Sequence, residues 1–148
     1  MTAFITLLLL AKAWNGITPG VSTRDDVVKK FGEPSKVVSS GGRDVLAYQT
    51  GKLIKGTTQT QFKVDSKSGV VERIDVFPAP VLSLEDISSA YGPACTAQAP
   101  ETREKPCYLK RDDEKRMYVV FVKLGLAVFF NADGKTVQTF AFLPEKKE

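Results

Sequence analysis

The two cysteines are the residues of this chain whose type and spacing most clearly favour a covalent link. Cys95 and Cys107 lie in two segments that favour strands, Ala94–Gln98 and Cys107–Arg111, with a polar loop, Ala99–Pro106, between them. If those strands pair, the two thiols come within reach of each other. In an oxidising compartment a disulfide here would stabilise the fold by roughly 2–3 kcal/mol. The alternative is two separate buried thiols.

The chain lacks the side chains that metal binding and catalysis most often use. The chain has no histidine, the commonest general base and metal ligand, and two cysteines are too few for zinc. The acidic clusters Asp25-Asp26 and Asp112-Asp113-Glu114 are explained by helix N-terminal charge and by a solvated turn. No Gly-x-Ser-x-Gly occurs, and the run Asn131–Gly134 lacks the later glutamate of a calcium loop. We therefore expect no enzyme, no metal and no cofactor.

Two short helices with marked ends organise the rest of the chain. In the first, Thr23 is placed as N-cap, acids occupy the first turn, and Gly32 and Pro34 follow its last turn. The same design returns sixty positions later over Ser83–Pro93. Leu82 and Ile87 there could form a hydrophobic staple.

Further matches predict an internal duplication. Tyr48 and Tyr108 are sixty apart, and the pattern of Val71–Pro78 returns at an offset of sixty-six in Val137–Pro144. Six extra residues are therefore expected after Tyr108. Self-similarity in a fixed order is the signature of repeated units.

The strand pattern completes an α+β fold of two tandem units, each a short helix packed on an antiparallel four-stranded sheet. The first unit spans 14–78, the second spans 79–144, and 145–148 form a tail. The predicted strands of the first unit are Ser35–Ser39, Val45–Thr50, Thr57–Asp65 and Val70–Phe77. Those of the second, besides the two that flank the cysteine loop, are Met117–Lys123, Leu126–Asn131 and Thr136–Leu143.

Two turns decide which side chains of the second sheet share a face. Leu124-Gly125 and Asp133-Gly134 are taken as two-residue loops, the latter as a type I′ turn. The face expected to take the helix bearing Ile87 and Tyr91 then carries Tyr118, Val120, Val122, Ala127, Phe129, Phe140 and Phe142. The other face carries Val119, Phe121, Lys123, Leu126, Val128, Phe130, Val137 and Thr139. That second face is also apolar, so it either packs on the first unit or binds a partner. A slip of one residue in either turn would exchange the faces.

The N-terminal run and the charge pattern bear on location. Met1–Ala13 has the apolar length of a signal peptide and ends in Ala-Lys-Ala, but it lacks a basic start, and an N-terminal helix is the alternative. We expect export to the periplasm, cell envelope or medium, and a cytoplasmic protein if the segment is no signal. The net charge of +4 is scattered among acids, so we expect no nucleic acid and at most a peripheral membrane contact.

The motifs resemble a known family. Gly20-Val21-Ser22-Thr23, Phe31-Gly32-Glu33-Pro34 and the later hairpin are similar to the small outer-membrane lipoprotein (SmpA/OmlA) domain. The paired arrangement over Gly20–Leu143 resembles the beta-lactamase-inhibitor-protein-like fold. The resemblance implies two sheets that form one concave surface for binding another protein. The chain lacks the lipid-attachment cysteine of the lipoproteins, so membrane anchoring is not implied.

The expected function is therefore a non-catalytic protein-binding module of a bacterial cell envelope or exterior. Its predicted contacts are Phe121, Phe130 and Tyr48, with Lys123 at the rim. On this hypothesis Phe121→Ala weakens partner capture and leaves thermal stability nearly intact. The alternatives are an inhibitor of a secreted enzyme that inserts Ala99–Pro106, and a small-molecule or lipid binder with a pocket between helix and sheet.

Overall fold

The computed structural model describes residues 13–144. The predicted leader, except for Ala13, and the tail 145–148 lie outside the described residues. The helices are α2 (Arg24–Phe31), α3 (Leu84–Tyr91) and the 3-10 helix η1 (Val122–Leu124). The strands are β1 (Lys36–Ser40), β2 (Arg43–Tyr48), β3 (Thr57–Asp65), β4 (Val71–Pro78), β5 (Leu109–Asp112), β6 (Met117–Phe121), β7 (Leu126–Phe130) and β8 (Val137–Phe142).

Reciprocal hydrogen bonds fix the start of both α-helices. Thr23 Oγ1 accepts from the Asp26 N–H at 3.3 Å, and Asp26 Oδ2 accepts from the Thr23 N–H at 2.8 Å. Ser83 and Asp86 repeat this pair at 3.2 and 2.8 Å. Each capping box satisfies N–H groups that a helix start leaves without partners. The two predicted helices are confirmed.

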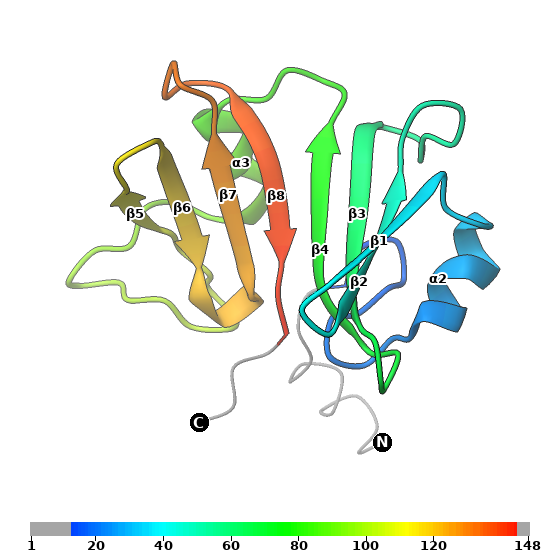
Figure 1. Cartoon of the computed structure of the whole chain (residues 1–148). Coiled ribbons are helices and arrows are strands. Elements are labelled where there is room, and N and C mark those ends of the chain that lie inside the picture. The colour runs from blue at the N-terminus through cyan, green and yellow to red at the C-terminus, as the bar shows by residue number, and fades with distance from the viewer. Residues whose placement is uncertain (1–12, 145–148) are drawn as a thin grey trace.

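The strands form one antiparallel sheet in the order β1-β2-β3-β4-β8-β7-β6-β5. Each half of the chain runs through a helix and then a meander of four strands, and the halves join where β4 pairs with β8 (Figure 1). Ile74 lies opposite Phe142, Asp75 opposite Ala141, and Val76 opposite Phe140. The α+β class is confirmed, with one continuous sheet.

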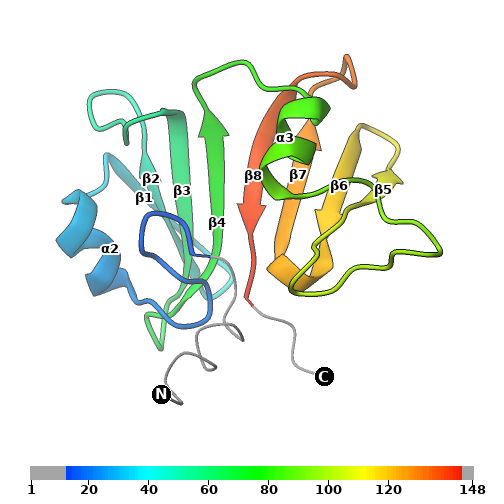
Figure 2. The same cartoon turned by 180° about the vertical axis from the view of Figure 1, so that it is seen from behind.

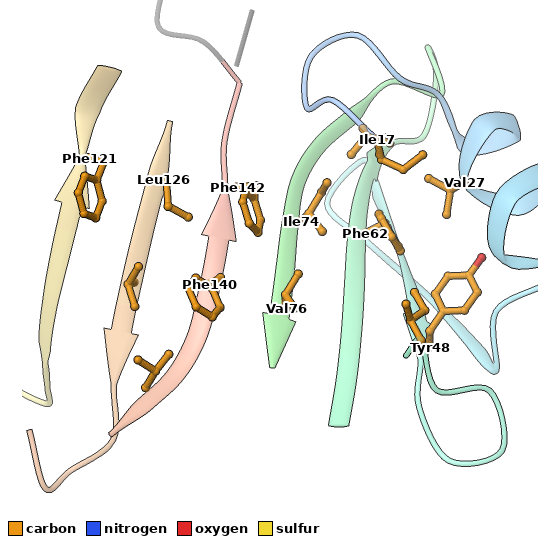
Figure 3. Close-up of a cluster of buried hydrophobic side chains, with 14 of the residues drawn as sticks. Ile17, Val27, Tyr48, Phe62, Ile74, Val76, Phe121, Leu126, Phe140 and Phe142 are labelled. Atoms are coloured by element: carbon orange, nitrogen blue, oxygen red, sulfur yellow. The ribbon is translucent and has the colours of Figure 1, made fainter. Parts of the chain in front are cut away.

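Both helices pack on the same face of this sheet, and the core lies between. Figure 2 looks at that face, and Figure 3 shows Phe140 and Phe142 of β8 beside Ile74 and Val76 of β4. In the first half, Phe31 of α2 contacts the ring of Tyr48 on β2 at 6.0 Å between centroids. In the second half, Tyr91 of α3 contacts Phe121 on β6 at 5.8 Å.

These ring contacts correct the proposed match between Tyr48 and Tyr108. The counterpart of Tyr48 on the second strand of its half is Phe121, whereas Tyr108 precedes the outer strand β5. The predicted strand Ala94–Gln98 is also wrong. Ala94 makes only a single parallel bridge to Tyr108, and a long loop separates α3 from β5, where the first half has a short connection between α2 and β1.

Neither predicted two-residue turn forms. Residues 122–125 make a 3-10 turn that ends at Gly125, which has φ 64°. A type I′ turn at Asp133-Gly134 needs positive φ at both residues. In residues 13–144 the sole non-glycine residue with positive φ is Asn15, so Asp133 does not meet that condition.

The register of β8 exchanges the predicted faces. Phe130 lies opposite Val137, but after a register shift Phe129 lies opposite Thr139 and Val128 opposite Phe140. One extra residue, Gln138, therefore moves the rest of β8 to the other side. The helix packs on the side with Phe121 and Phe130, which is the reverse of the prediction.

Candidate functional site: the open face of the sheet

The face opposite the helices, called here the open face, is continuous across all eight strands. Cross-strand partners connect one row of side chains from edge to edge: Lys36, Ala47, Gln61, Asp75, Ala141, Ala127, Val120 and Leu109. Figure 1 shows α3 behind the sheet in this view, and Figure 2 shows it in front. The open face is therefore a single surface to which both halves contribute.

An aromatic cluster with an arginine lies on the second half of this face. The rings of Tyr118 and Phe129, which are cross-strand partners, lie 5.1 Å apart between centroids. The guanidinium carbon of Arg116 lies 4.3 Å from the centroid of Phe129, and its Nη1 donates to Gln138 Oε1 at 2.5 Å. These contacts hold the aromatic and cationic groups in place while all three side chains stay partly accessible.

A cluster of ion pairs lies on the first half. Asp75 Oδ2 is 3.3 Å from Lys63 Nζ, and Asp75 Oδ1 accepts from Arg73 Nε at 2.9 Å. Arg43 Nε donates to Glu72 Oε1 at 2.6 Å nearby. The carboxylate of Asp75 is buried but has two cations, which compensates for its lost hydration.

Small side chains lie between these two clusters. Ala141 and Ala127 are only 1% and 5% exposed, although they lie on the face opposite the two described α-helices. Their larger neighbours along the row and on adjacent strands must therefore shield them. Their small size leaves the flanking aromatic and cationic groups as the accessible part of the surface.

The structure places three of the four predicted contact residues in the core. Tyr48 is 1% exposed and Phe121 and Phe130 are 0% exposed, so the expectation that they stand on an accessible surface is wrong. Tyr48 donates its hydroxyl to Gly32 O at 2.6 Å, and burial raises its pKa to about 12. For Phe121 and Phe130 the physical reason is the exchange of faces described above, whereas Tyr48 lies on the helix side of β2 against Phe31.

Lys123 is exposed, but it lies in η1 beyond the end of β6. Its backbone N–H donates to Glu101 Oε2 at 3.0 Å, and burial raises the pKa of that carboxyl. Sequence reasoning did not propose Tyr118 and Phe129 as contacts, because it assigned their face to the helix. The alternation placed both on one face, but the predicted two-residue turn would have set Tyr118 opposite Asn131 instead of Phe129.

The predicted disulfide is confirmed. Cys95 and Cys107 are bonded, with their Cα atoms 4.9 Å apart. The bond closes the loop that contains residues 96–106, most of which are exposed. A disulfide is consistent with an oxidising compartment outside the cytoplasm.

No group of three or more metal-ligating side chains is found in residues 13–144. No helix within that range is long and apolar enough to cross a membrane.

Comparison with known proteins identifies the fold. No family model matches the chain, and no curated protein is similar to it in sequence. Among solved structures, the chain is similar to a DUF4309 family protein, YjgB, from Bacillus subtilis subsp. subtilis str. 168, with a TM-score of 0.56 and 18% identity. The match covers 88% of this chain and 83% of that one. At this identity the likeness concerns the fold alone.

Proposed function

We propose that this chain is a non-catalytic, exported module that binds another protein through the open face. The carrying observation is the partly accessible cluster of Tyr118, Phe129 and Arg116 on a sheet face that no helix within residues 13–144 covers. Tyrosine, phenylalanine and arginine are the residue types enriched in protein interfaces, and tyrosine and arginine are prominent among hot spots. These three residues replace Tyr48, Phe121 and Phe130 as the proposed contacts, and Lys123 stays a proposed rim residue.

The charge of the open face favours an acidic partner. By register or contact, its cations are Lys36, Arg43, Lys63, Arg73, Arg111 and Arg116. Its carboxylates are Asp65, Glu72 and Asp75. Cations therefore outnumber carboxylates by two to one. Complementary charge on a partner would raise the association rate and fix its orientation.

We also propose that the chain arose by duplication. On this proposal its halves are two tandem units similar to those of the beta-lactamase-inhibitor-protein-like fold. Under the sequence offset of sixty-six, Ile74 corresponds to Phe140 and Val76 to Phe142. The β4–β8 register pairs Ile74 with Phe142 and Val76 with Phe140, so each half contributes the same positions to the contact. When two copies are related by a two-fold axis, position i of one copy contacts position j of the other and position j contacts position i, as these two pairs do.

Export is proposed on the disulfide together with the apolar start of the chain. Mass spectrometry of protein from its native source tests this directly. Cleavage near Ala13 and a mass lower by two hydrogen atoms at the cysteines are expected. An uncleaved N-terminus with both thiols free contradicts export.

Site-specific photo-crosslinking tests the binding surface. A crosslinker at Tyr118 should capture one defined protein, whereas a crosslinker at Ala90, exposed on α3, should not. With that protein purified, Phe129→Ala and Arg116→Ala should each weaken affinity about tenfold or more. Val122→Ala, an exposed apolar change in η1, is the control. Equal affinity of all variants would place the contact elsewhere.

A second candidate function is inhibition of a secreted enzyme by the loop 96–106. The observation in its favour is that this loop is exposed while the disulfide fixes its ends. Rigid exposed loops lose little entropy on insertion into a cleft. Replacing residues 97–105 by a glycine-serine linker of equal length should abolish inhibition of a target enzyme and leave open-face binding unchanged.

A further inference from the structure

The helix-bearing side of the sheet contains a cleft over the seam between β4 and β8. Figure 2 shows α3 and the segment before α2 on this side. The seam cleft has a volume of about 290 Å³, and its lining includes Trp14, Val76, Leu82, Tyr91, Phe140 and Phe142. Most of its lining residues are apolar or aromatic, and Asn15, Lys55 and Thr57 add polar groups at one side. The volume is near the lower end of the range of roughly 300–1,000 Å³ that small-ligand pockets occupy.

A second depression adjoins this cleft. It is more open, has a volume of about 670 Å³, and contains Lys30, Lys52 and Lys55 with Phe31, Leu53 and Ile54. Asn15 and Lys55 line both depressions, so the two lie side by side. We call the second depression the lysine basin.

The lysines of the basin are not neutralised by the rest of the described chain. Within residues 13–144, no carboxylate lies within 4.0 Å of the ammonium of Lys30, Lys52 or Lys55. Lys52 Nζ donates to the backbone carbonyl of Glu33 at 3.0 Å, which positions the ammonium but leaves its charge. Lys63, by contrast, pairs with Asp75. Three uncompensated cations beside an apolar cleft match a ligand with one anionic end and one apolar end.

We propose that this site binds a free, single-chain anionic amphiphile such as a fatty acid. The acyl chain lies in the seam cleft against the aromatic rings, and the carboxylate faces the lysine basin. Lys55, which lines both depressions, lies where the two ends of the ligand meet. The site is on the opposite side of the sheet from the open face, so it is independent of the protein-binding function.

Trp14 provides the measurement, because it is the chain's only tryptophan and it lines the cleft. The full chain is titrated with monomeric octanoate, decanoate and dodecanoate while tryptophan fluorescence is recorded. Saturable binding is expected, and each added methylene should tighten it about twofold to fourfold until the cleft is filled. Dodecyltrimethylammonium, which has the same chain and a positive head, should bind more weakly than dodecanoate.

Matched variants separate the two ends of the ligand. Lys55→Gln should weaken dodecanoate binding about twofold to fivefold, whereas Lys67→Gln, in the exposed hairpin loop, should leave it unchanged. Leu82→Asn should weaken binding through the apolar end, whereas Val81→Asn, at a position that is 82% exposed and does not line the cleft, should not. Circular dichroism of each variant confirms that it is folded.

Several outcomes would overturn this proposal. One is the absence of saturable binding at any chain length. Another is equal binding of dodecanoate and its cationic analogue. Binding only to phosphatidylglycerol vesicles would assign the lysines to a membrane surface instead.

Discussion

Replacing Phe121 and Phe129 by alanine, one at a time, separates the two faces of the sheet by their energetics. Phe121 is buried on the helix side, where its ring contacts Tyr91 and Tyr108 at 5.8 Å each. Phe129 is partly exposed on the open face beside Tyr118 and Arg116. The two residues belong to adjacent strands and lose the same atoms on substitution.

The expected costs differ because the environments differ. Phe121→Ala removes a fully buried ring and leaves a cavity, which costs about 3–5 kcal/mol of unfolding free energy. Phe129→Ala removes a ring that is partly in water, together with one ring pair and one cation–π contact, and should cost about 1–2 kcal/mol. For a chain of this size, the melting temperature should fall by about 6–20 °C for Phe121→Ala and by about 2–8 °C for Phe129→Ala.

Urea unfolding followed by circular dichroism measures both values in one experiment. The slope of free energy against urea should be the same for the two variants and the parent, so that the midpoints report stability. A loss for Phe129→Ala that equals or exceeds that of Phe121→Ala would refute the assignment of faces. It would also remove the basis for placing the binding surface opposite the helices.

Three further predictions concern the covalent link, an unpaired hydroxyl and a buried phenol. Replacing Cys95 and Cys107 together by alanine should cost about 3 kcal/mol, and a reducing agent should shift the midpoint of the parent but not of this variant. Thr60 Oγ1 is buried without a hydrogen-bond partner, so Thr60→Val should stabilise the fold by about 1 kcal/mol. As the control, Thr57→Val removes a hydrogen bond to Ile54 O at 2.7 Å and should destabilise the fold. The pKa of Tyr48 in the folded protein is raised from 10.0 to about 12. The contribution of its neutral hydroxyl to the free energy of unfolding is therefore complete below pH 10 and is lost as the pH rises to 12. Tyr48→Phe should therefore flatten the decline measured by urea unfolding in that interval, and an unchanged decline would contradict the shift.

Local sequence signals were sufficient to locate the helices and most strands. Thr23 and Ser83, each followed by aspartate three positions later, marked the helix starts, and the two capping boxes are formed as the spacing implies. The alternation of Thr57–Asp65 gave β3 with its observed bounds. In each case the information lies within one turn of helix or one strand.

The region around the disulfide was harder to predict because the second half departs from the first. The sequence pattern predicted a strand at Ala94–Gln98 and matched Tyr48 with Tyr108 at an offset of sixty. The chain instead forms the long loop before β5, and Phe121 takes the position of Tyr48. Aromatic residues near a strand are common in both halves, so spacing alone could not select the right one.

The candidate site depended on one residue that no local pattern marks. Gln138 is the extra residue between Val137 and Thr139, and its insertion decides whether Phe140 and Phe142 lie with Leu126 and Val128 or with Phe129. Both arrangements put apolar residues on both faces, so alternation could not distinguish them. The position of the helix does distinguish them. Ile87 and Tyr91 of α3 cover the face with the larger continuous apolar surface, which after the shift includes Phe121, Phe130, Phe140 and Phe142. The opposite face then keeps Tyr118, Phe129 and the two alanines, so the bulge that completes the core is also what leaves an aromatic surface open to a partner.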